Sequence, residues 1–157
     1  MDKLWAPWRI KYIQAKKSKG CIFCRKPRQK KDALNYIITR KRYCFSLLNI
    51  FPYNNGHMMV APYRHVADFE KLRPEEKMDI LELISESIAK LKKVLKPQGI
   101  NVGINLGKAA GAGIAKHLHV HIVPRWDADT NFMPVISQTK VISQSLDDLY
   151  SILRTEK

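Results

Sequence analysis

Three histidines alternate with branched apolar residues between positions 117 and 123. This period of two predicts a strand that sends His117, His119 and His121 to one face and the apolar residues to the core. A single histidine in a strand is usually a packed structural residue. Three on one face instead gather groups that titrate near neutral pH, which indicates histidine chemistry or metal binding.

A glycine-rich loop leads directly into these histidines. Residues 105–116 contain Gly107, Gly111 and Gly113 among small side chains. Glycine allows backbone N–H groups to approach an anion and point at it, although glycine-rich loops also serve as ordinary hairpin connections. Because this loop ends at the histidines, it predicts a phosphate group held beside them.

Two cysteines, Cys21 and Cys24, are separated by two residues and precede what reads as a basic loop rich in Lys, Arg and Pro. Two thiolates at this spacing suit zinc, which then needs further ligands from elsewhere in the chain. A redox pair is the alternative, but the βαβ context of that motif is absent. The third cysteine, Cys44, is expected to be a small buried residue of a strand.

Residues 117–123 match the motif His-x-His-x-His followed by two apolar residues, and the chain therefore resembles the histidine triad (HIT) family. Residues 4–9, 124–126 and 129–134 are similar to the branch with the diadenosine tetraphosphate phosphorylases (ATP adenylyltransferases). The resemblance implies that His119 is a nucleophile. It would attack the α-phosphorus of a dinucleoside polyphosphate and form a covalent nucleotidyl-histidine. His121 and His57 would sit beside the phosphate oxygens.

The resemblance also implies a set of substrate contacts. Asn49 would meet the ribose hydroxyls, although by itself it indicates an Asx turn, as His57 by itself indicates a core histidine. Asn105 and the loop amides would stabilise charge on the reacting phosphoryl group. Lys108 and Arg125 would neutralise the outer phosphates. The residues assigned to substrate binding are Asn49, Asn105, Gly107, Lys108, Gly111, Gly113, Arg125 and Trp126.

A structural zinc site is a further implication of the resemblance. In many bacterial relatives such a cysteine pair shares zinc with two histidines. The matching residues here are His65 and His117, so Cys21, Cys24, His65 and His117 form the expected ligand set.

The segment just before the triad departs from the family. Members often carry Ser or Thr there, whereas residues 113–116 are Gly-Ile-Ala-Lys, so Lys116 or a backbone N–H would have to serve the leaving group. The leaving group, and thus the exact substrate, is consequently open, and the sequence does not decide between phosphate and water as the acceptor. The branch resemblance favours phosphorolysis, with a nucleoside phosphoramidate hydrolase as the alternative within the family.

Two other classes of function remain open. In a zinc hydrolase, His117, His119 and His121 would be the metal ligands, with Asp127 or Asp129 as a nearby base. In a binding module, the basic N-terminal third would hold nucleic acid or a protein partner. Residues 1–43 contain half of the 28 Lys and Arg and carry +12 of the net charge of +14. This run lacks the interleaved aromatic residues of single-strand binders, so nucleic acid is not the favoured partner.

These residues must be positioned by a folded scaffold, and the sequence predicts one α+β domain over 1–157, with a basic segment at 1–34. The chain length suits one core, no stretch could span a membrane, and no signal peptide or disulfide framework is evident, so a cytoplasmic enzyme is expected. About five antiparallel strands should carry one long helix over 73–95. The strands are expected at 35–39, 43–48, 57–62, 100–106 and 117–123. Short helices should lie near 7–13 and over 146–153, and the segment from Trp126 to Ile136 should be irregular.

The resemblance also bears on assembly. Family relatives usually pair as homodimers, which exposed edge strands make reasonable.

Overall fold

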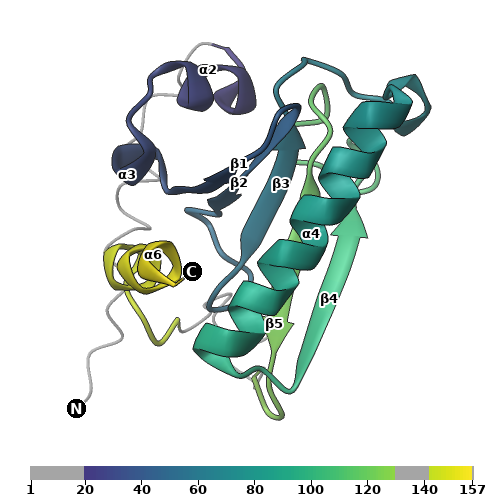
Figure 1. Ribbon diagram of the computed structural model, residues 1–157. Coiled ribbons are helices and arrows are strands. Elements are labelled where there is room, and N and C mark those ends of the chain that lie inside the picture. Colours follow the sequence, from purple (N-terminus) through teal and green to yellow (C-terminus); the bar gives the residue numbers. More distant parts are fainter. Residues whose placement is uncertain (1–19, 130–141, 157) are drawn as a thin grey trace.

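One antiparallel sheet of five strands, in the order β1-β2-β3-β5-β4, organises the protein (Figure 1). The computed structural model describes residues 20–129 and 142–156. The strands are β1 (Ile37–Arg40), β2 (Cys44–Leu48), β3 (Met58–Pro62), β4 (Gly99–Ile104) and β5 (Val120–Arg125). The helices are α2 (Ile22–Arg28), α3 (Asp32–Asn35), the 3-10 helix η1 (Phe69–Lys71), α4 (Pro74–Leu95) and α6 (Leu146–Thr155).

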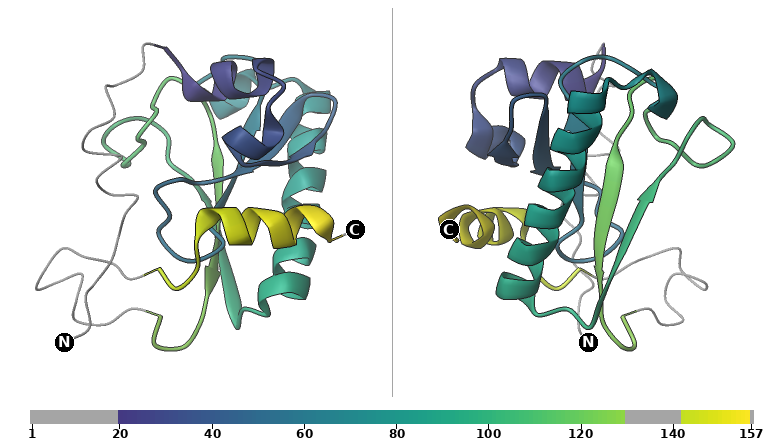
Figure 2. Two further views of the ribbon diagram at one scale, coloured as in Figure 1. Left: turned by 90° about the vertical axis from the view of Figure 1, so that its left-hand side faces the viewer. Right: turned by 45° about the vertical axis from the view of Figure 1, so that its right-hand side comes forward.

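The long helix α4 covers one face of the sheet, as Figures 1 and 2 show. It begins at Pro74, and the Arg73 N–H donates to the Glu76 carboxylate at 2.8 Å, which caps the first turn. Arg64 also donates to Glu76, and this bond holds the pKa of the Glu76 carboxyl at about 2. The buried side of α4 packs in the main core with the apolar residues that alternate with the histidines, Leu118, Val120 and Ile122.

A second, smaller apolar cluster lies on the opposite face of the sheet. Its members are the buried residues Phe23, Ile37, Phe45, Leu47, Met59 and Ala61. Phe23 comes from α2, so the cysteine-bearing segment is anchored on this face. Alternate side chains of β2 and β5 therefore point in opposite directions, one set into the core under α4 and the other to the face that holds the histidines.

The expected elements are largely confirmed, with corrections to three strands and to the basic segment. β1 begins at Ile37 rather than at residue 35, because Asn35 ends α3, and β4 ends at Ile104 rather than at residue 106. β5 begins at Val120 rather than at residue 117, because the Leu118 N–H donates to the Val66 carbonyl at 2.7 Å instead of joining the ladder. The basic segment after Cys21 is not a loop: α2 runs to Arg28 and includes Pro27, and α3 follows it. The helix expected near 7–13, and the irregular segment from residue 130 onward, lie outside the described residues.

The turn before β3 requires glycine. Gly56 has a φ of +76°, and a Cβ there would lie 2.5 Å from Leu95 Cδ1 and 3.0 Å from Pro124 Cγ. Any side chain would thus push the turn away from α4 and move His57, the next residue. Within the described part of the chain, no helix combines the length and apolar character needed to cross a membrane.

Candidate active site and metal site

His119 is held in one tautomer by a main-chain atom. Its Nδ1 lies 2.8 Å from the carbonyl oxygen of His117. A carbonyl can only accept, so Nδ1 carries the proton of the neutral ring and Nε2 keeps a lone pair. The side chain is 4% exposed, and this burial lowers the pKa of His119. A buried neutral imidazole with a fixed lone pair is suited to nucleophilic attack.

His57 and His121 form a second, linked pair. The Tyr53 N–H donates to His57 Nδ1 at 3.0 Å, so the His57 proton lies on Nε2, which donates to His121 Nδ1 at 2.9 Å. The proton of His121 must then lie on its Nε2. That atom is buried and has no hydrogen-bond partner among the described residues. Burial, with a smaller effect of His119, lowers the pKa of His121 to about 4.

The two ring systems lie side by side with complementary roles. The centroids of His119 and His121 are 4.9 Å apart, with ring planes at 70°. One ring offers an unprotonated nitrogen and the other an unpartnered N–H donor. Such a pair can attack a phosphorus atom and donate to one of its oxygens at the same time.

Asn49 has a structural role beside this pair. Its Oδ1 accepts the Phe51 N–H at 2.9 Å, which is an Asx turn, while its Nδ2 lies 3.3 Å from His57 Nδ1. The expected Asx turn is therefore present, and it places Asn49 against a site histidine. Tyr53 was missed by the sequence reasoning. Its half-exposed ring packs against His57 at 4.5 Å in a tilted arrangement and stacks on His121 at 5.4 Å. The only signal in the sequence was its place in the turn before His57.

The glycine loop reaches the site through its C-terminal end. Ile114 packs with the Phe23 cluster, and its carbonyl accepts the His117 N–H at 3.2 Å. The amides of Gly111 and Ala112 donate within the loop, to the carbonyls of Lys108 and Gly107.

Asn105 follows β4 directly. The ladder between β4 and β5 ends at the pair of Ile104 and Val120, so Asn105 and His119 each lie one residue beyond it. Lys108, Gly107 and Gly113 are exposed in the loop.

Arg125 and Trp126 lie at the other end of β5 from the histidines. Four residues of strand, about 13 Å, separate Arg125 from His121. The Arg125 guanidinium is held by both carboxylate oxygens of Asp129, at 2.6 and 2.9 Å, and by Asn101. Trp126 borders a cavity of about 350 Å³, lined by Asn54, Asn55, Trp126, Asp129 and Ser143. The structure thus does not bring these two residues together with the triad.

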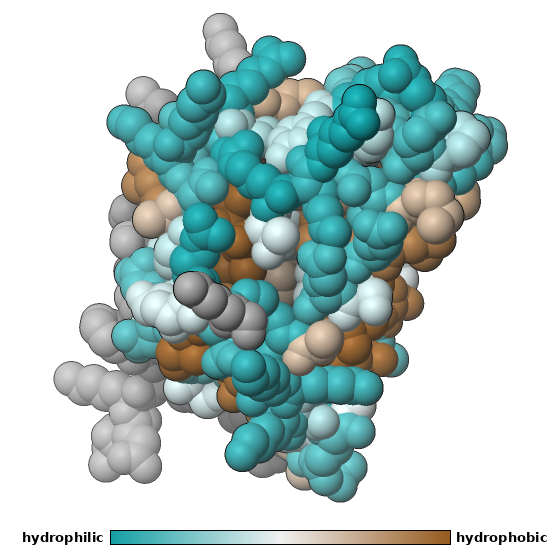
Figure 3. Space-filling view, viewed as in Figure 1, coloured by the Kyte–Doolittle hydropathy of each residue, from teal (hydrophilic) through white to brown (hydrophobic). Residues whose placement is uncertain are grey.

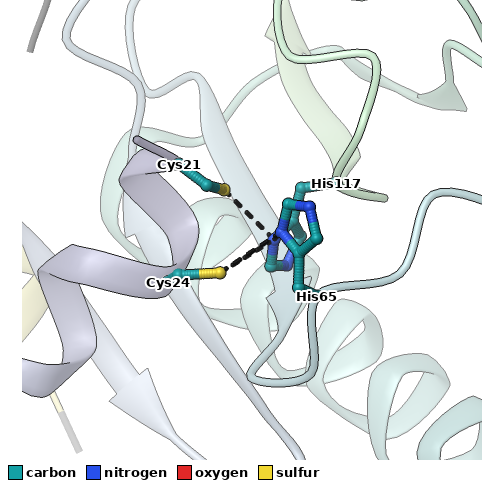
Figure 4. Close-up of side chains that lie close together, drawn as sticks. All are labelled: Cys21, Cys24, His65 and His117. Atoms are coloured by element: carbon teal, nitrogen blue, oxygen red, sulfur yellow. Dashed lines mark hydrogen bonds between the residues drawn. The ribbon is translucent and has the colours of Figure 1, made fainter. Parts of the chain in front are cut away.

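Cys21, Cys24, His65 and His117 converge on one point (Figure 4). The Nε2–H of His117 donates to the Pro62 carbonyl at 2.9 Å, so the lone pair on Nδ1 faces the thiols. His117 Nδ1 lies 3.2 Å from Cys21 Sγ, 3.6 Å from Cys24 Sγ and 3.2 Å from His65 Nδ1. Tetrahedral zinc would space such ligands about 3.3–3.8 Å apart, so donor types and spacing both fit a closed four-ligand site.

This arrangement disfavours metal binding by the triad itself. His117 turns its free nitrogen to the cysteines, His119 Nδ1 is bonded to the main chain, and His121 Nδ1 accepts from His57. Across residues 20–129 and 142–156, Cys21, Cys24, His65 and His117 form the one group of His, Cys, Asp or Glu side chains placed to share a metal ion. The three histidines therefore divide between two tasks, with His117 in the cysteine cluster and the other two beside His57.

Comparisons with known proteins find similar sequences and similar folds. Residues 30–128 match the HIT domain. The chain is 38% identical to the AP-4-A phosphorylase of Mycobacterium tuberculosis over 165 residues, covering 99% of this chain and 84% of that protein. It superimposes on a Zn-bound histidine triad family protein from Mycobacterium smegmatis with a TM-score of 0.67 and 25% identity, covering 87% and 91% of the two chains. A hypothetical histidine triad nucleotide-binding protein from Sulfolobus tokodaii gives a TM-score of 0.70 at 23% identity, covering 86% and 90%.

Proposed function

Because the chain belongs to the HIT domain family, we propose that it cleaves dinucleoside polyphosphates at the α-phosphorus through a nucleotidyl-histidine formed on His119. The observation that carries the proposal is the hydrogen bond from His119 Nδ1 to the His117 carbonyl, which leaves the lone pair on Nε2. The substrate class is supported by the name of the M. tuberculosis relative.

The reaction proceeds in two displacements. The lone pair of His119 Nε2 forms a bond to the α-phosphorus, and the bond from that phosphorus to the bridging oxygen breaks, so the outer phosphates leave with the electron pair. His121 Nε2–H donates to an oxygen of the phosphoryl group as charge develops. An oxygen of the acceptor then attacks the same phosphorus, and the electrons of the N–P bond return to His119.

Inorganic phosphate is the acceptor that we favour over water. The support is the resemblance to the phosphorylase branch and the M. tuberculosis relative. The two acceptors give different products from diadenosine tetraphosphate: ADP and ATP with phosphate, AMP and ATP with water. Product analysis with and without added phosphate therefore tests this choice directly.

The role of His119 is tested by trapping the intermediate. We expect mass spectrometry of rapidly quenched wild-type protein to find a nucleotidyl adduct on His119. Replacing His119 by Ala should remove the adduct and lower kcat by about 10³-fold or more, as loss of a covalent nucleophile does. S46A is the control, since Ser46 is a buried polar residue of β2 rather than of the histidine pair. Equal turnover by wild type and H119A would refute the mechanism.

We further propose that Cys21, Cys24, His65 and His117 hold a structural zinc ion. All four positions of a tetrahedral ion would be filled by protein, which leaves none for substrate. The Zn-bound M. smegmatis neighbour supports this assignment. The ion would tie α2 to the loop after β3 and to the first residue of the triad.

A homodimer is the assembly that we propose. β4 is an edge strand that pairs only with β5 in the described sheet. Val102 on β4, and Met78 and Leu81 on α4, are exposed to 47%, 58% and 60%. Figure 3 shows apolar surface along the right-hand border of this view, on the side of α4 and β4. A second copy could bury it by extending the sheet.

A further inference from the structure

Phe23 lies between the two cysteines in sequence and contacts two site histidines in space. Its side chain is fully buried on the histidine face of the sheet. The ring centroid is 4.9 Å from that of His119, with planes at 33°, and 5.3 Å from that of His117. The Cys21–Cys24 turn therefore touches the nucleophile through one aromatic ring.

A hydrogen bond alone does not fix the plane of the His119 imidazole. The bond from Nδ1 to the His117 carbonyl sets which nitrogen is protonated only while the ring stays turned toward that carbonyl, and the second side-chain torsion of histidine is intrinsically broad. The ring plane must be set by what packs on it. His121 lies on the imidazole edge-on at 4.9 Å, and Phe23 packs against it in a tilted arrangement, with ring planes at 33°, at the same distance.

We propose that Phe23 is a positioning residue that holds the His119 imidazole so that Nε2 faces the reacting phosphorus. The conformation of residues 21–24 then affects the position of His119 through two contacts. One is the Phe23 ring, and the other is His117, which faces both cysteines with Nδ1 while its carbonyl accepts from His119. The inference rests on the proposed function of His119 as the nucleophile.

The test compares two phenylalanines of one cluster. Phe45 is also fully buried in the Phe23 cluster, but its ring stacks on Tyr63 at 5.2 Å. F23L and F45L therefore remove the same atoms from the same kind of environment. We expect both variants to lose similar thermal stability. Only F23L should lower kcat on diadenosine tetraphosphate, by about tenfold or more, with KM within about twofold of wild type.

A second measurement does not depend on turnover. Long-range ¹H–¹⁵N spectra of the histidine rings, recorded on ligand-free protein, should show His119 as the Nδ1–H tautomer in wild type and F45L. F23L should show His119 as a mixture of tautomers, because the His119 imidazole is then no longer held against the His117 carbonyl. Metal content per chain should be equal in all three proteins.

These readouts separate the two hypotheses. A wild-type protein without turnover would refute the proposed function, while the spectra would still test Phe23. Equal kcat losses in F23L and F45L, or an unchanged His119 tautomer in F23L, would overturn the role of Phe23. A kcat loss accompanied by metal loss in F23L would also overturn it, because the effect would then arise from a collapsed turn.

Discussion

Main-chain atoms decide which ring nitrogen carries the proton in three of the site histidines. The Pro62 carbonyl fixes His117, the His117 carbonyl fixes His119, and the Tyr53 N–H fixes His57. Side chains can rotate away from one another, but these backbone groups are held by strands and turns. The lone pair that faces the cysteines and the lone pair on His119 are therefore both set by the fold, which is the form of preorganisation that catalysis requires.

The buried His57–His121 pair predicts the acid side of the pH–rate profile. His121 accepts from His57 only while its Nδ1 is unprotonated, and the pKa of His121 is lowered to about 4. The pair is thus intact at neutral pH and is lost as the pH falls toward 4. We expect the rate of adduct formation to be flat between pH 8 and about 6 and to fall only below about pH 5.

Quenched-flow measurement of the adduct across this range checks the prediction. Far-UV circular dichroism at each pH is the control, since it separates loss of the pair from unfolding. A descending limb centred near the ordinary histidine pKa of about 6.5 would show that the pair is not buried as described.

At the level of elements, the period of the sequence was enough to place most of the fold. Alternation predicted which face of β5 carries the histidines. Apolar residues at helical spacing predicted α4, namely Met78, Leu81, Ile84, Ile88, Leu91 and Leu95, although the structure leaves Met78 and Leu81 exposed. The convergence of Cys21 and Cys24 with His65 and His117 was expected from a family resemblance, because no local pattern joins residues so far apart in sequence.

Of the described helices, sequence reasoning missed α2, α3 and η1, and α2 is the one that bears on the site. It is seven residues long, has no side-chain N-cap bond, and includes Pro27, so local propensity argues against it. Phe23 was missed for the same reason, since its contacts with His117 and His119 exist only once α2 is docked. Tertiary packing, and not propensity, forms this element.

Because α2 is so short, we expect metal removal to lower the thermal stability of the protein strongly. Isolated helices of fewer than about 12 residues are marginal in water, so α2 depends on its docking. We expect chelation of zinc, or the C24S substitution, to lower Tm by about 5 °C or more and to abolish metal binding. C44S is the matched control, because Cys44 is a buried cysteine of the α4 core outside the cysteine–histidine cluster.

Metal analysis and calorimetry on the three proteins measure this effect. Purified wild type should hold one zinc per chain, and C44S should retain it. A wild-type protein without zinc, together with a C24S variant of unchanged Tm, would remove the structural metal from this account.

On the scale of the whole molecule, the main apolar core and the candidate active site lie on opposite faces of the sheet. The core under α4 contains most of the large apolar side chains, whereas the opposite face holds the histidines and the small Phe23 cluster. The net charge of +14 suits a polyanionic substrate by long-range attraction.

The exposed edge of the sheet gives the last prediction, on assembly. Val102 points to the α4 side of β4 because it pairs with Ile122, and together with Met78 and Leu81 it leaves apolar surface next to unpaired strand edge. We expect wild type to have twice the chain mass of 18.2 kDa in light scattering, and V102D to have the mass of one chain. Burying a carboxylate at a symmetric interface places two like charges close together, which is strongly unfavourable.

Leu34 provides the control for surface hydrophobicity alone. It is 71% exposed on α3, which packs near β1 at the opposite edge of the sheet (Figure 1). L34D replaces an apolar side chain that is even more exposed than Val102 and should leave the dimer intact. If wild type had the mass of one chain at all concentrations tested, or if L34D and V102D dissociated alike, the β4 edge would not be the dimer interface. The site, by contrast, would be unaffected by that result, since every contact described for His57, His119 and His121 lies within one chain.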